Sequence, residues 1–110
     1  MGATKTDIFS ESQNETALML KALGHPARVA ILEYLLKVDG CICNDIVNVI
    51  NLAQPTISQH LKELKNAGII KGSVEGTAIC YCIEKSALQK IASYFGNAIE
   101  KVNCKNTGCC

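Results

Sequence analysis

The sequence predicts a mainly α-helical domain with one small β-hairpin. Apolar residues recur at helical spacing along most of its 110 residues, aromatic residues make up only 5%, and one glycine-bearing stretch switches to a period of two. The length suits one domain with a single core. We expect that domain at residues 14–102, after a flexible N-terminus at 1–13 and before a cysteine-rich tail at 103–110.

Two helices are predicted on either side of Gly24. The first begins between Ser10 and Asn14 and stops at Gly24, a residue typical of the position just past a helix end. The second begins with Pro26, which suits a first helical turn, and ends at Asp39-Gly40. Apolar residues surround most of this second helix, which predicts a central place in the core: Val29, Ala30, Ile31, Leu32, Leu35 and Leu36.

A pair of helices with a tight turn between them is predicted at 45–50 and 54–67. The turn, Asn51-Leu52-Ala53, has the length found in helix-turn-helix units. Apolar residues at suitable positions would join the two helices: Ile46, Ile50, Leu52, Ile57, Leu61 and Leu64. Gly68 then ends the second helix of the pair.

The remaining elements are a hairpin and a long helix. The stretch "IIKGSVEGTAICYCI" alternates around Gly72 and Gly76, which predicts a β-hairpin. A last helix at 85–102 has an apolar seam with spacings of 3, 4, 4 and 3, typical of helix pairing: Leu88, Ile91, Phe95, Ile99 and Val102. With support from Leu18 and Leu20, this order predicts a winged helix-turn-helix that dimerises through its first and last helices.

The second helix of the pair carries a polar face suited to DNA. Its members are Gln54, Thr56, Ser58, Gln59, Lys62 and Lys65, and Lys71 follows at the start of the hairpin. Glutamine can bond adenine edges, hydroxyls can bond bases or phosphates, and lysine can neutralise phosphates. The chain has a net charge of only +1, but residues 54–73 hold three lysines against the single acid Glu63. An ordinary amphipathic surface helix is the alternative, which the surrounding turn and hairpin disfavour.

The segments "LKALGHPARVAILEYLL" and "LAQPTISQHLKELKNAGII", followed by the hairpin, resemble the arsenic-repressor (ArsR/SmtB) family over about residues 14–100. The resemblance implies a homodimeric winged-helix repressor that releases operator DNA when a metal, metalloid or oxidant reaches a sensing site. Ala53 departs from the family's usual serine at this helix start. The family's zinc-type site, an acidic/His pair in the last helix, is missing, and so is the cysteine that its persulfide sensors carry in "VAILEYLL".

Seven cysteines without a secretion signal predict metal or redox chemistry in the cytoplasm. Cys104, Cys109 and Cys110 lie beyond the predicted last helix, where no core needs them, and three thiolates suit a soft three-coordinate ligand. Cys41 and Cys43 are the second choice, because "CICND" is offset by one residue from the family's arsenite motif. For Cys80 and Cys82, on one face of a predicted strand, we expect a structural role.

The two histidines are interpreted as packing or phosphate-contact residues rather than metal ligands. His25 precedes Pro26 at a helix start, and His60 lies beside the buried stripe of the second helix of the pair. No Cys-x-x-Cys, Cys/His/Asp set or phosphate-binding glycine loop supports a thiol enzyme.

The predicted function is therefore a transcriptional repressor released from double-stranded operator DNA by a thiophilic inducer, trivalent arsenic above others. A thiol redox switch, or a response to another metal, is the alternative. We expect a homodimer with no permanently bound cofactor. The sequence has no apolar run of membrane-spanning length, so no membrane partner is expected.

Overall fold

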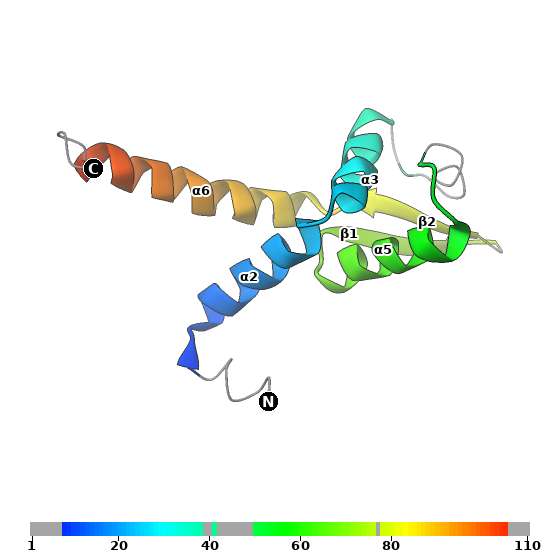
Figure 1. Ribbon diagram of the computed structural model, residues 1–110, viewed down its shortest axis with the longest axis horizontal. Helices are drawn as coiled ribbons and strands as arrows, with labels where there is room; N and C mark the ends of the chain where they lie inside the picture. Colours follow the sequence, from blue (N-terminus) through cyan, green and yellow to red (C-terminus); the bar gives the residue numbers. More distant parts are fainter. Residues whose placement is uncertain (1–7, 39–40, 42–49, 77, 106–110) are drawn as a thin grey trace.

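The computed structural model describes residues 8–38, 41, 50–76 and 78–105. These residues form four helices and a two-stranded sheet, in the order α2 (Glu11–Leu23), α3 (Pro26–Lys37), α5 (Gln54–Asn66), β1 (Ile70–Glu75), β2 (Ala78–Ile83) and α6 (Lys85–Lys105). α3, α5 and the hairpin form a body from which α2 and α6 extend on one side (Figure 1). The mainly α fold with a small hairpin is confirmed. The helix predicted at 45–50 falls outside the described residues, apart from its last residue.

Side-chain caps fix where the first two helices begin. Ser10 Oγ accepts the N–H of Gln13 at 3.0 Å, and Gln13 Oε1 accepts the N–H of Ser10 at 2.9 Å, so α2 starts at Glu11. At α3, His25 Nδ1 accepts the N–H of Ala27 at 3.0 Å, ahead of Pro26 in the first turn. His25 is therefore a helix cap, which is a structural role.

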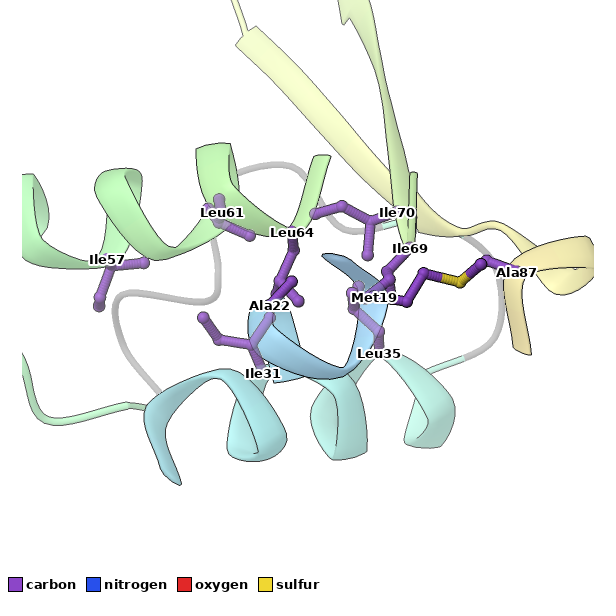
Figure 2. Close-up of a cluster of buried hydrophobic side chains, with 10 residues drawn as sticks. All are labelled: Met19, Ala22, Ile31, Leu35, Ile57, Leu61, Leu64, Ile69, Ile70 and Ala87. Atoms are coloured by element: carbon purple, nitrogen blue, oxygen red, sulfur yellow. The ribbon is translucent and has the colours of Figure 1, made fainter. Parts of the chain in front are cut away.

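The core lies where α2, α3, α5, β1 and the first turn of α6 meet (Figure 2). Its fully buried large side chains are Ile31, Ile57, Leu64, Ile69 and Ile70. Burying a large aliphatic side chain contributes about 1.5–3 kcal/mol. Apolar packing thus positions α5 and the hairpin relative to α3.

α3 is less central than its sequence predicts. Ile31 and Leu35 are buried, but Val29 is 40% exposed and Leu36 is 60% exposed. Among the described elements, α2, α5 and β2 contact α3 and leave part of its apolar circumference uncovered. The expectation that Val29 and Leu36 belong to the core was wrong.

The hairpin has two chemically different faces. β1 and β2 are antiparallel with Ile70 opposite Ile83 and Lys71 opposite Cys82. Ile70, Tyr81 and Ile83 pack on or into the core, and the opposite face carries Lys71, Ser73, Cys80 and Cys82. Gly76 follows β1 with φ of 66°, a left-handed conformation that glycine adopts without strain. The predicted hairpin and its alternation are confirmed.

α6 continues to Lys105, three residues beyond its predicted end, so Cys104 lies within a helix rather than after it. The helix packs on α2 near its start, where Lys90 Nζ lies 3.2 Å from Glu15 Oε2. Leu88 and Ile91 of the predicted seam are partly buried. The rest of the seam is exposed on the projecting part of the helix: Phe95 at 45%, Ile99 at 61% and Val102 at 62%.

Candidate nucleic-acid interface

α5 divides cleanly into a buried side and an exposed side. Ile57, His60, Leu61 and Leu64 face the body, and each is buried. The six polar residues predicted to meet DNA are all exposed: Gln54, Thr56, Ser58, Gln59, Lys62 and Lys65. Their side chains can therefore reach a ligand without disturbing the core.

The first turn of α5 is accessible but weakly capped. Ala53 occupies the cap position and makes no side-chain hydrogen bond, which is the consequence expected from alanine there. Gln54 Nε2 donates to Ser58 Oγ at 3.4 Å, and Gln59 Nε2 donates to Glu63 Oε2 at 3.1 Å. These bonds hold both amides along the helix surface. On DNA binding, each amide could exchange its hydrogen bond within the helix for one to a base edge.

Charge on this surface is positive overall. Lys62 and Lys65 lie in the later turns of α5, and Lys71 lies on β1, where its ammonium is 3.9 Å from Glu84. This ion pair is largely exposed, so it restrains Lys71 weakly. The arrangement can place polar groups in a groove and ammonium groups beside the flanking phosphates.

Behind the exposed face, His60 holds α5 to the start of α3. Arg28 Nε–H donates to His60 Nδ1 at 3.1 Å, and the His25 and His60 rings lie 4.5 Å apart. Burial, together with His25 and Arg28, lowers the pKa of His60, and Glu63 partly opposes them. His60 is only 8% exposed. Of the two roles considered for it, packing and phosphate contact, the structure therefore shows packing. No group of three metal-binding side chains occurs among the described residues.

The structure describes only part of each predicted cysteine group. Cys104 is free and exposed in α6, while Cys109, Cys110 and Cys43 lie outside the described residues. Cys41 is joined to Cys82 by a disulfide, across 41 positions in sequence and 4.6 Å between Cα atoms. Cys80 is buried and also disulfide-bonded. The structural role expected for Cys80 and Cys82 thus includes covalent cross-links, which their alternation on a strand did not predict.

Comparison with known proteins identifies the family. The family model described as bacterial regulatory protein, arsR family, matches residues 25–71. An uncharacterized HTH-type transcriptional regulator of Methanocaldococcus jannaschii is 39% identical over 82 residues, which span 74% of this chain and 91% of that protein. The chain belongs to the ArsR family.

Two further relatives of this ArsR-family chain have more specific names. A Staphylococcus aureus cadmium resistance transcriptional regulatory protein, CadC homolog, is 34% identical over 79% of this chain and 72% of its own length. The arsenical resistance operon repressor of Staphylococcus xylosus is 28% identical over 89% of both chains. The family consists of DNA-binding transcriptional regulators, so the prediction that the protein is not an enzyme is confirmed.

A solved structure agrees with this fold. The crystal structure of an ArsR family transcriptional regulator covers 89% of this chain and 100% of its own, with a TM-score of 0.78 at 19% identity. The winged helix-turn-helix prediction is thus confirmed. In the described part of the chain, every helix is too short or too polar to cross a bilayer.

Proposed function

We propose that this ArsR-family regulator is a homodimeric repressor that leaves its operator when trivalent arsenic, as arsenite or antimonite, binds its cysteines. The exposed polar face of α5 beside Lys71 is the observation that carries the DNA-binding part. Gln54, Thr56, Ser58 and Gln59 would meet base edges in the major groove, with lysines on phosphates. We propose a cytoplasmic location, because a repressor must reach operator DNA and because thiols that bind arsenic must be reduced.

A second copy of the chain completes the DNA-reading unit. The exposed seam of Phe95, Ile99 and Val102 on α6, with Leu18 of α2 at 54% exposure, offers an apolar surface for two-fold pairing. Pairing of this kind would space two copies of α5 by about one turn of DNA. One operator would then hold two half-sites.

For the inducer we propose the thiols of Cys104, Cys109 and Cys110, with Cys41 and Cys43 as second choice. Cys104 is a free thiol on the same helix as the proposed dimer seam. A ligand bound there could shift α6, and with it the spacing of the two reading helices. Such a ligand regulates only if it binds the conformer with low DNA affinity more tightly than the other.

Arsenic is preferred because thiolates select soft ions and because one relative is named for arsenical resistance. The relative named for cadmium resistance supports a soft divalent metal as a second candidate inducer. Zinc should act weakly, since the described residues contain no histidine or carboxylate cluster to complete a tetrahedral site.

The test begins by selecting a binding duplex from a random pool with the reduced protein. Fluorescence anisotropy then follows that duplex as arsenite, cadmium or zinc is added. We expect arsenite to weaken binding 5–150-fold, for a coupling of about 1–3 kcal/mol. Failure to enrich any duplex would reject the DNA-binding part, and an unchanged anisotropy with arsenite would reject the inducer.

Two double variants locate the arsenic site. Cys109→Ser/Cys110→Ser should bind the duplex like the parent and ignore arsenite, whereas Cys41→Ser/Cys43→Ser should still respond. The reverse pattern would assign arsenic sensing to the segment after α3 and leave the tail without this role.

A further inference from the structure

Two segments far apart in sequence meet at one pair of sulfur atoms. Cys41 lies four residues beyond α3, and Cys82 lies near the end of β2, next to the core residue Ile83. We call the β1–β2 hairpin the wing. The disulfide joins the segment between α3 and α5 to the end of the wing that lies next to the core. The loop that it closes contains all of α5 and β1, so the link encloses most of the proposed DNA-reading surface.

The surroundings of this pair suit reversible thiol chemistry. Cys41 is exposed, so small oxidants and thiols can reach its sulfur. Lys71 is the direct cross-strand partner of Cys82 on the same face of the hairpin. Lys71 Nζ lies 3.9 Å from Glu84 Oε1, so a positive and a negative side chain both stand close to this end of the hairpin.

The same register connects the pair to DNA. Lys71 is the wing residue that we place on a phosphate, and opposite residues of an antiparallel pair have Cβ atoms about 4.5–5.5 Å apart. Docking requires α5 to enter the major groove while Lys71 reaches its phosphate. A covalent link at Cys82 fixes the wing to the segment that follows α3. The wing can then no longer shift relative to α5 when both contact DNA.

We propose that Cys41 and Cys82 form a reversible redox site, and that their disulfide lowers the affinity of the protein for operator DNA. This inference rests on the proposed DNA-binding function but concerns cysteines other than the proposed arsenic-binding tail. It also gives Cys82 a regulatory role that its position on a strand did not predict.

The oxidant that we assign is a hydroperoxide. The Cys41 thiolate attacks the peroxide oxygen and becomes a sulfenic acid as the alcohol or water leaves. The Cys82 thiolate then attacks the Cys41 sulfur and displaces water. In total, two thiols and one hydroperoxide give one disulfide, one alcohol (water from hydrogen peroxide) and one water. A dithiol reductant returns two electrons and two protons and restores both thiols.

The test compares the full-length parent in dithiothreitol with the same protein after hydrogen peroxide and removal of excess oxidant. Alkylation and peptide mapping by mass spectrometry identify the linked cysteines, and anisotropy measures affinity for the selected duplex. We expect a Cys41–Cys82 linked peptide, a 5–150-fold loss of affinity, and full recovery in dithiothreitol.

Single variants assign the effect. Cys41→Ser and Cys82→Ser should bind like the reduced parent before and after peroxide. Ala92→Ser is the control, because it introduces a serine at an exposed position of α6 and leaves every thiol in place, and it should respond like the parent. A response that survives in Cys82→Ser, or that disappears in Ala92→Ser, would overturn the assignment.

The remaining outcomes are also decisive. A linked peptide with unchanged or tighter DNA binding would refute the regulatory part, and a map containing only other cysteine pairs would refute the site. If anaerobic cadmium released DNA through Cys41 and Cys82 while peroxide had no effect, the pair would be a metal site instead. If the reduced parent enriched no duplex, the proposed function would fail, and the peptide map would still decide whether the redox pair exists.

Discussion

Arg28 donates a hydrogen bond from Nε–H to His60 Nδ1 at 3.1 Å, and this bond ties the first turn of α3 to the middle of α5. A second Arg28 nitrogen donates to the carbonyl oxygen of Ala22 at 3.2 Å, which adds the end of α2 to the same junction. Because Nδ1 accepts, His60 is neutral in this arrangement. An uncharged imidazole therefore adds a polar contact to the apolar packing that orients α5 against α3.

Acid should weaken the protein through His60. Its pKa in the folded chain is below the ordinary value of 6.5, chiefly because of burial, then His25 and Arg28. The unfolded chain binds this proton more readily, so the stabilisation is complete above about pH 6.5 and is lost as the pH falls through the lower folded pKa. Urea unfolding between pH 7.5 and 5 should show the loss.

Substitutions separate this effect from general acid sensitivity. His60→Gln should flatten the pH dependence, whereas His25→Asn, which replaces the capping Nδ1 with a side-chain oxygen, should retain most of it. Equal slopes in the parent and His60→Gln would show that another group is responsible.

Two adjacent leucines test the position of the core on α3. Leu35 is 4% exposed and Leu36 is 60% exposed. Leu35→Ala should lower the free energy of unfolding by about 2–5 kcal/mol, because it leaves a cavity. Leu36→Ala should change it by about 0.5 kcal/mol or less. Denaturant titrations of the two variants at equal protein concentration measure these free energies. Similar losses of unfolding free energy in both variants would contradict this packing.

The uncapped start of α5 can be improved. Ala53 contributes no side-chain hydrogen bond, and serine there could accept one from the first turn. Ala53→Ser should raise the free energy of unfolding by about 1 kcal/mol. Ala92→Ser makes the same chemical change at an exposed position within α6 and should instead destabilise slightly. Thermal melting compares the two variants, and a destabilised Ala53→Ser would mean that the cap geometry is unsuitable.

The proposed dimer seam predicts a charge effect confined to one side of α6. Phe95→Glu would bury a carboxylate between two helices and should give monomers with little operator affinity. Asn97→Glu adds the same charge about half a helical turn away and should leave the dimer intact. Sedimentation of both variants checks this, and a dimeric Phe95→Glu would refute the seam.

Base and phosphate contacts should respond differently to substitution on α5. Lys62→Ala should weaken all duplexes alike and reduce the salt slope by about 1 unit. Gln59→Ala should instead relax the preference for the selected duplex over a mismatched one. Titrations at several salt concentrations distinguish the two, and parent-like behaviour in both variants would refute this orientation of α5.

The sequence was informative wherever local spacing decides structure. The alternation in the hairpin predicted which residues share a face, and the polar positions of α5 were all found exposed. It was less informative where distant segments decide. Neither Val29 nor Leu36 signals which side of α3 remains uncovered, since both are as apolar as their buried neighbours.

The cysteines show the same limit more clearly. Cys41 and Cys82 are separated by 41 positions, and no local pattern relates the end of one helix to the second strand of a hairpin. The sequence does contain two Cys-x-Cys motifs, at 41–43 and 80–82, and this repetition could have suggested a contact between the two segments. Only the packing of the hairpin against α3 brings one motif to the other.

The projecting part of α6 has a thermodynamic consequence. Beyond its contact with α2, the helix exposes Phe95, Ile99 and Val102, and a lone helix of about this length is marginal in water. In the proposed dimer, the second chain supplies the free energy that keeps this segment helical. Folding of the last turns would then follow mass action, with a melting temperature that rises with protein concentration. The concentration of the protein would thus help to determine what fraction of its chains has the end of α6 folded.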